Sequence, residues 1–382
     1  MRLARPSPIC RLTTTATRLM GFSPQQLRVG LRNIFRLTAS VVLAVTIVPG
    51  VAVAQSGPAD HAPNGTEILL LGTAGGPPLH KDRSEPSSLL IVDGRPYLID
   101  CGIGTMRRMV RAGIRSETIG TIFITHHHPD HDLGLADVMA NDFLNLGLAD
   151  AAHTINIYGP PQTKELVEAA FRYISIPFGV FADEQFGETG PRNLFVAHDI
   201  PHDGVVFQDD KIRVIAAENS HYALMPAHFR TQIKSYSYRF ETPHGVVVFT
   251  GDTGPGDAPV IRLAKGADVL ISEVLDLDAM VKFARALGEE RHWSPQRSNA
   301  LVEHMKFEHL DMEEVGELAS KAQVKSVVLY HFGAEGVEPA DFVSAVKKYF
   351  SGPVFAGADL DRYCLSRQAG KRTSARILSP CH

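Results

Sequence analysis

The stretch Thr125-His126-His127-His128-Pro129-Asp130-His131-Asp132 concentrates metal-ligating side chains at one point of this 382-residue chain. It follows the apolar run Ile119–Ile124, which predicts a buried strand, so its side chains project from the end of a rigid element. Imidazole nitrogen and carboxylate oxygen are ligands that zinc and similar ions prefer. Because adjacent side chains diverge, we expect two ions, held by His126 with His128 and by Asp130 with His131. The alternative is a solvated loop with chance histidines.

Three later residues complete this set of candidate ligands. His221 follows a predicted strand in Asn219-Ser220-His221, Asp252 follows another in Phe249-Thr-Gly-Asp252-Thr, and His331 lies in Val328-Leu-Tyr-His-Phe-Gly333. Taken singly, His221 and His331 would be interpreted as ordinary packed or surface histidines, and Asp252 as a turn residue. Together with the cluster at 126–131 they predict a metal site, provided that they converge on one cleft.

These motifs resemble those of the metallo-β-lactamase superfamily. The spacing H-x-H-x-D-H at 126–131 is similar to its signature, and Leu98-Ile-Asp100-Cys-Gly102 resembles its first motif, whose aspartate supports the site. The motifs around His221, Asp252 and His331 follow in the family's order, and the similarity covers about residues 67–357.

The resemblance implies a fold and a metal centre. The fold is α/β, a four-layer αββα sandwich with the site at the edge between its two sheets. One metal would take His126, His128 and His221, and the other Asp130, His131 and His331, with Asp252 bridging. Two Zn²⁺ ions are the expected cofactors, with iron and manganese left open. Such a pair activates water as the nucleophile, and Asp130 would orient that water.

Further motifs resemble the ribonuclease Z and arylsulfatase-like branch. They are Leu71-Gly-Thr-Ala-Gly-Gly76, Tyr158-Gly159-Pro160-Pro161 and His309-Leu-Asp-Met-Glu-Glu314. The resemblance implies that His309 donates a proton to the leaving group; the alternative is a surface histidine at a helix N-terminus. The glycine loop lacks the Lys-Ser/Thr of a P-loop, so its glycines are expected to let the backbone approach the site. We expect four other histidines to be solvated or to lie behind the ligands: His127, His228, His292 and His304.

Apolar periodicity and turn residues predict the remaining organisation. Strands are expected at Glu67–Gly72, Ser88–Val92, Tyr97–Asp100, Ile212–Ala217, Ser235–Glu241, Val246–Thr250, Val269–Ile271 and Val327–Leu329. Helices are expected at Gly104–Ala112, Thr163–Ile174, Ala258–Ala264, Ser298–Lys306 and Met312–Ala322. Residues 66–382 are expected to form one hydrolase domain. The least regular sequence, 175–211, is predicted to be a loop or insertion at the site.

The N-terminal region predicts export. Residues 1–54 contain seven Arg and no Asp, Glu or Lys, and the apolar run Leu37–Val48 precedes Ala52-Val53-Ala54. This order is typical of a signal peptide, and the run is shorter than the roughly 20 residues of a membrane anchor, which is the alternative. Translation could start at Met1 or Met20. Residues 55–65 are predicted to be a flexible segment, and the mature protein to be periplasmic or secreted, without a membrane segment.

Charge and cysteine content limit the classes of substrate and partner that we expect. The chain has 38 basic and 42 acidic side chains, and loss of the seven leader arginines leaves a net charge of −11. A body this acidic makes nucleic acid an unlikely substrate. The resemblance to the ribonuclease Z and arylsulfatase-like branch implies a small-molecule phosphodiester or an aryl or alkyl sulfate ester as the substrate. A lactone or β-lactam, and an iron-bound redox or binding role, remain alternatives. Homodimerisation is left open, as is a Cys364–Cys381 disulfide.

We predict that the mature protein begins at Gln55 and lies outside the cytoplasm, because cleavage follows an A-x-A site after a short apolar run. N-terminal sequencing of periplasmic or secreted material measures this directly. A membrane fraction that retains residues 37–54 would contradict the prediction.

Overall fold

The structure, a computed structural model, describes residues 65–76, 78–147, 154–184, 194–333, 336–367 and 375–378. The predicted leader, and the segment 55–65 except for Gly65, lie outside the described residues. Among the helices described, none combines the length and apolar character that a membrane crossing requires.

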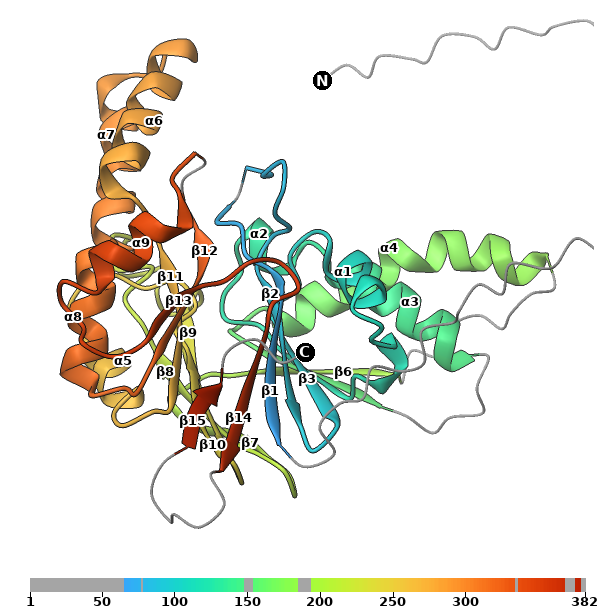
Figure 1. The fold of residues 1–382 in the computed structure, drawn as a ribbon. Helices are drawn as coiled ribbons and strands as arrows, with labels where there is room; N and C mark the ends of the chain where they lie inside the picture. The colour runs from blue at the N-terminus through green and yellow to red at the C-terminus, as the bar shows by residue number, and fades with distance from the viewer. Residues whose placement is uncertain are drawn as a thin grey trace, which may run out of the picture. The chain divides into compact units, whose positions relative to one another are not determined.

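Two sheets form the centre of the fold (Figure 1). In the described part of the chain, the first sheet has eight strands, in the order β15 (Ala375–Leu378), β14 (Arg362–Arg367), β1 (Thr66–Gly72), β2 (Ser87–Val92), β3 (Arg95–Ile99), β4 (Thr121–Phe123), β5 (Ile155–Gly159) and β6 (Phe195–Asp199). The second has seven, in the order β13 (Val354–Ala356), β12 (Val327–Phe332), β11 (Val269–Val274), β10 (Gly245–Phe249), β9 (Tyr236–Thr242), β8 (Arg213–Glu218) and β7 (Gly204–Gln208).

Helices cover the outer face of each sheet (Figure 1). Those that follow strands of the first sheet are α1 (Thr105–Arg111), the short 3-10 helix η1 (Ser116–Thr118), α2 (Pro129–Asp132), α3 (Leu135–Gly147) and α4 (Thr163–Asp183). Those of the second half are α5 (Ala258–Leu263), α6 (Leu277–Glu290), α7 (Pro295–Phe307), α8 (Met312–Ala322) and α9 (Pro339–Val346).

Three apolar layers account for this order. In β1, Ile68 and Leu70 join the core between the two sheets, whereas Leu69 and Leu71 join the core beneath the helices of the first half. A third core lies between the second sheet and α5, α8 and α9. Because β1 is buried on both faces, its sequence is continuously apolar rather than alternating. The predicted αββα sandwich is confirmed.

The two sheets are joined by hydrogen bonds at the end of β4. The Tyr236 amide donates to the carbonyl oxygen of Thr125 (2.9 Å), and the Tyr238 hydroxyl donates to that of Ile124 (2.7 Å). Strand β4 is parallel to β3, and β10, β11 and β12 are mutually parallel. Carboxyl ends of parallel strands meet at one edge, so the polar residues that follow these strands gather there.

The prediction of a loop or insertion over 175–211 is wrong for the described residues. Helix α4 continues to Asp183 with Pro177 inside it, and β6 and β7 follow. Helix α4 continues past Pro177 although proline removes one backbone hydrogen bond, and Phe178 beyond it packs on the core of the first half. Helices α2, α3, α6 and α9 were not among the predicted helices.

The cysteines differ in state. Cys101 is a buried free thiol, and Cys364 is disulfide-bonded. Cys381, the partner considered from the sequence, lies outside the described residues.

Asp142 on α3 is a buried carboxyl group that makes stability depend on pH. Its side chain is 0% exposed, and burial raises its pKa to about 8 against the opposing effect of Ser116. The unfolded-state pKa is about 3.9. A carboxyl group with a raised folded-state pKa stabilises the fold while protonated, so that stability is lost as pH rises from about 4 through about 8.

We therefore expect Asp142→Asn to raise Tm at pH 8 more than at pH 5, measured by thermal melts across this range. Glu168→Gln, which removes an exposed carboxylate from neighbouring α4, is the control and should leave the pH profile unchanged. Parallel Tm profiles for wild type and Asp142→Asn would rule out the buried, protonated carboxyl.

Candidate metal centre

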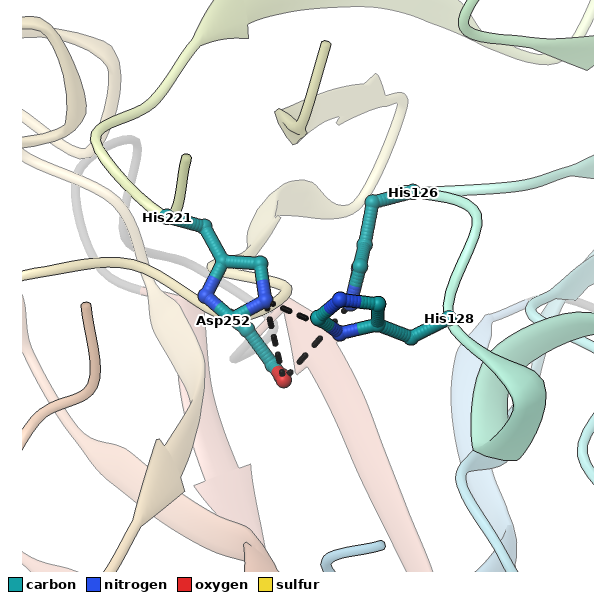
Figure 2. Close-up of side chains that lie close together, drawn as sticks. All are labelled: His126, His128, His221 and Asp252. Atoms are coloured by element: carbon teal, nitrogen blue, oxygen red, sulfur yellow. Dashed lines mark hydrogen bonds and ion pairs between the residues drawn. The ribbon is translucent and has the colours of Figure 1, made fainter. Parts of the chain in front are cut away.

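The structure brings all seven predicted ligands together at the edge between the sheets. One group consists of His126, His128, His221 and Asp252, whose ligand atoms all lie within 4.8 Å of one another. Figure 2 shows the three imidazoles of this group turned toward the Asp252 carboxylate. A second group, within the same limit, consists of Asp130, His131 and His331. The division into two groups is the one that the sequence predicted.

Asp252 faces both groups with different oxygen atoms. Its Oδ2 lies 3.7 Å from His126 Nε2 and 3.9 Å from His221 Nε2. Its Oδ1 lies 3.5 Å from His131 Nε2 and 3.4 Å from His331 Nε2. A single carboxylate thus spans the space between the two groups, the position that a bridging ligand requires.

Local backbone geometry explains how one short segment supplies both groups. His126 and His128 are two positions apart, with His127 between them, and extended chain directs such side chains to the same side. Pro129 then occupies the first turn of α2, where its fixed φ is favourable, and the chain turns. Asp130 and His131 consequently project in a new direction, where His131 Nε2 lies 3.6 Å from Asp130 Oδ2.

His331 reaches the site through an irregularity in β12. The pairing of β11 with β12 shifts between Glu273 and Val274, so His331 is the extra residue of a bulge. Its φ is 50°, which is uncommon outside glycine. The bulge turns its side chain so that Nε2 lies 3.4 Å from Asp130 Oδ2. Strained backbone of this kind concentrates at functional sites.

Hydrogen bonds behind the imidazoles fix their orientation. His131 Nδ1 lies 2.9 Å from Asp100 Oδ2, and Asp100 also accepts from the Thr125 amide (2.7 Å). His221 Nδ1 donates to the carbonyl oxygen of Glu308 (2.8 Å). Each contact leaves Nε2 of the ring facing the site, as in metal-binding histidines. Asp100 thus occupies the supporting position that the family resemblance implied.

The donor atoms fit a pair of cations. Among the described residues, buried His126 Nε2, His131 Nε2, His331 Nε2 and Asp252 Oδ1 have no hydrogen-bond partner. Buried polar atoms without a partner are costly, and a bound ion would satisfy all four. Burial lowers the pKa of His126 and of His221 well below the ordinary value. Neutral imidazole is the form that binds metal.

The neighbouring histidines lower the pKa of the central carboxylate, Asp252. Burial by itself would raise the pKa of Asp252, but His331, His131 and His126 outweigh it and hold the pKa well below its ordinary value. Asp252 is therefore ionised, as a bridging ligand must be.

The glycine-rich loop after β1 closes over the second group. The Gly76 amide donates to Asp130 Oδ2 (2.9 Å). A Cβ atom at Gly76 would lie 2.3 Å from Asp130 Cβ, and one at Gly75 would lie 2.9 Å from His331 Nδ1. The close approach of this backbone to the site, expected from the sequence, is confirmed.

His309 lies beside the ligands rather than on the surface. Its Nδ1 is 3.8 Å from Asp252 Oδ2 and 2.6 Å from Glu273 Oε2, and its Nε2 is 3.1 Å from His304 Nε2. Burial raises the pKa of Glu273 well above its ordinary value and lowers that of His309 to about 3. These directions favour a neutral imidazole at His309 beside a protonated Glu273.

The chain around His309 is held on both sides. Glu308 ends α7, and its side chain accepts from His304 Nδ1 (2.6 Å) and from the Leu224 amide (2.8 Å). Leu310 accepts from the Leu275 amide (3.0 Å), which ties the segment to the end of β11. Asp311 then opens α8 with a capping box.

Sequence reasoning missed two residues of this site, Glu273 and Glu308. Glu273 also forms a third set of potential ligand atoms with Asp252 and His331. An acidic residue in the fully buried strand β11 was the available signal, because Glu is rarely buried without a partner. Of the four weaker candidates, His304 reaches the site. His127 bonds Asp132 (2.9 Å) instead, and His228 and His292 are exposed.

Comparison with known proteins identifies the family. Residues 95–332 match the sequence profile described as "Beta-lactamase superfamily domain". The chain therefore belongs to the metallo-β-lactamase superfamily, in which its relatives place it in the ribonuclease Z-like branch. It is 29% identical over 300 residues to "Ribonuclease Z" of Mycobacterium bovis (strain BCG / Pasteur 1173P2), covering 78% of this chain and 97% of that protein. It is 30% identical over 299 residues to "Ribonuclease Z" of Mycobacterium sp. (strain KMS), covering 78% and 95%.

Solved structures agree on the fold. The short form of human tRNase Z superposes with a TM-score of 0.52 at 20% identity, covering 78% of this chain and 98% of that one. The metallo-β-lactamase fold protein YhfI of Bacillus subtilis superposes with a TM-score of 0.54 at 16% identity, covering 79% and 99%. Relatives named as ribonucleases count against the expectation that nucleic acid is an unlikely substrate.

We predict that Asp252→Ala lowers metal occupancy from about two ions per chain to one or fewer and abolishes turnover, because its carboxylate faces both groups. Mass-spectrometric metal counting measures the occupancy. Asp132→Asn is the control, since Asp132 lies in the same motif but bonds His127, and it should retain both ions. Two retained ions in Asp252→Ala would show that Asp252 is only a turn residue.

Proposed function

We propose that this protein is a di-zinc hydrolase of small phosphodiesters or aryl or alkyl sulfate esters. The observation that carries the proposal is the single carboxylate, Asp252, with one oxygen toward each of two ligand groups and with His309 beside it. The first ion would be held by His126, His128 and His221, and the second by Asp130, His131 and His331. Two ions bound there would supply an activated water nucleophile and a Lewis acid for the ester oxygen.

The protein's own residues orient and protonate the reactants. Asp130 is fixed by the Gly76 amide and directs its carboxylate into the cleft, where it would orient the attacking water. His309 would release its Nε2 proton to the departing oxygen, and Glu273 at Nδ1 would restore it. Both the loop and the α7–α8 segment are anchored by backbone hydrogen bonds, so these groups are preorganised.

RNA is the second candidate substrate, because the similar proteins named above are ribonucleases. Two features favour a small ester over RNA. The body without its leader has a net charge of −11, whereas binding to a phosphate backbone depends on Lys and Arg. Among the described residues that line the cleft at the metal centre, none is Lys or Arg.

Amide or lactone hydrolysis and iron-based redox chemistry are the further alternatives. The Glu273–His309–His304 chain supplies a proton donor for a strongly basic departing oxygen, as hydrolysis of an alkyl ester requires. The ligand set of histidines and carboxylates suits zinc, and iron and manganese can also bind to it. We also retain the proposal that the protein acts outside the cytoplasm after cleavage of its leader.

A substrate panel tests the function. Purified protein with counted metals is assayed on bis-p-nitrophenyl phosphate, p-nitrophenyl sulfate, nitrocefin, an acyl lactone and a precursor tRNA with a 3′ trailer. Turnover of the phosphate or sulfate ester, lost on chelation and restored by Zn²⁺, is the expected result. Faster turnover of the lactone or nitrocefin, or cleavage of the tRNA alone, would reject the proposal in favour of the corresponding alternative.

We predict that His309→Ala keeps both metals and lowers the rate about 10²–10⁴-fold on alkyl esters, as expected for loss of a general acid. An alkoxide needs a proton to leave, whereas p-nitrophenolate is stable without one, so loss on nitrophenyl esters should be small. Steady-state kinetics on both classes measures the difference.

The control is His292→Ala, which removes an exposed histidine between α6 and α7 and should keep full activity. Equal losses on alkyl and nitrophenyl esters would assign His309 a positioning role. No loss on either would remove the proton donor from the mechanism.

A further inference from the structure

We propose that the cleft beside the metal centre is a subsite for an apolar alcohol, the part of a small ester that leaves during hydrolysis. The proposal rests on the ester hydrolase function proposed for the same site. Its starting observation is a cavity of about 340 Å³ that opens onto His128, Asp130, Asp252 and His331. This volume lies at the lower end of the roughly 300–1,000 Å³ typical of ligand pockets, which favours a small ligand.

The wall of the cavity opposite the metal ligands is apolar. It is contributed by the loop after His221, the end of β11 and the two helices α6 and α7. The apolar residues that line it are Tyr222, Met225, Leu275, Met280, Leu301 and Met305. Unbranched methionines adapt to different shapes, so the wall suits an alkyl chain as well as an aromatic ring.

The charged residues of the cavity exclude a second anionic group. Its ionisable side chains are the metal-site residues together with Glu273, Glu308 and His304, and no Lys or Arg lies among the described residues that line it. A further phosphate would therefore have no Lys or Arg to pair with, which is unfavourable in a partly buried site. Only the ester group at the metals has electrostatic partners.

The position of the proton donor indicates which half of the ester occupies this wall. Leu301, His304 and Met305 have the spacing i, i+3 and i+4, so they share one face of α7. His304 Nε2 lies 3.1 Å from His309 Nε2. The apolar wall therefore adjoins the imidazole that protonates the departing oxygen, and the group against it is the leaving alcohol.

Both helices of the wall are fixed at their ends. Asp276 caps α6 by accepting from the Ala279 amide (2.9 Å), and Ser294 caps α7 by accepting from the Arg297 amide (3.3 Å). Figure 1 shows α6 and α7 side by side, and Gly288 on α6 permits the close contact with Ser298 on α7. The wall is thus a preformed surface.

Straight-chain alcohols test the subsite without requiring turnover. The zinc-loaded protein is equilibrated with 8-anilinonaphthalene-1-sulfonate, and displacement of the dye by alcohols from methanol to hexanol is followed by fluorescence. Each added methylene should lower the inhibition constant about fourfold, as burial of a CH₂ group predicts. The same alcohols should competitively inhibit hydrolysis of bis-p-nitrophenyl phosphate in the same order.

Leu301→Gln should at least halve the slope of the logarithm of the inhibition constant plotted against the chain length of the alcohol. Its metal content and Tm should stay near those of the wild type. Phe283→Gln, an exposed position on α6 outside the cavity, is the control and should keep the wild-type dependence. Met280→Gln on α6 replaces Leu301→Gln if that variant does not fold.

The outcomes separate the two proposals. Inhibition constants that do not change with chain length, or an equal dependence in wild type and Leu301→Gln, would overturn the apolar subsite. Chain-length dependence that Leu301→Gln removes, in a protein that hydrolyses no ester, would support the subsite and reject the hydrolase function.

Discussion

The structure depends on the burial of ligand atoms around one carboxylate. Asp252 is 1% exposed and has histidines from both metal groups within 4 Å of its two oxygens. Several of these imidazole nitrogens have no other partner in the described part of the chain. Burial of these unpaired ligand atoms costs free energy unless cations bind them, so we expect metal binding to stabilise the fold.

The αββα sandwich positions these ligand atoms because its strands are rigid at the ends from which the ligand residues project. Thr125, which begins the ligand segment, is bonded to Asp100 of the first sheet and to Tyr236 of the second. The same cross-sheet contact places the end of β4 opposite the end of β10. Fixed ligand positions allow hydrogen bonds behind each ring to set its orientation, which tunes metal affinity.

The metal ligands and most of the apolar wall come from different parts of the fold. The ligands follow strand ends, whereas Met280, Leu301 and Met305 of the wall belong to α6 and α7, two helices outside the layers that build the core. His304 and Glu308 connect the two parts. His304 contacts His309 and the Glu308 carboxylate, and the carbonyl oxygen of Glu308 accepts from His221. If the proposed subsite selects the alcohol, we expect changes in these helices to alter substrate choice while the metal ligands stay in place.

The sequence alone determined the α/β class and the candidate ligands, because short motifs after apolar strands carry that information locally. The four-layer sandwich and the division of all seven ligands into two groups came from the family resemblance of those motifs. The same resemblance also placed His309 near the site. Only the tertiary structure showed that Asp252 faces both groups, that His331 sits in a bulge, and that Glu273 and His304 complete the chain to His309. These features depend on contacts between residues far apart in the sequence. The extent of α4 was also mispredicted, because the helix continues through Pro177 to Asp183, beyond its predicted end at Ile174.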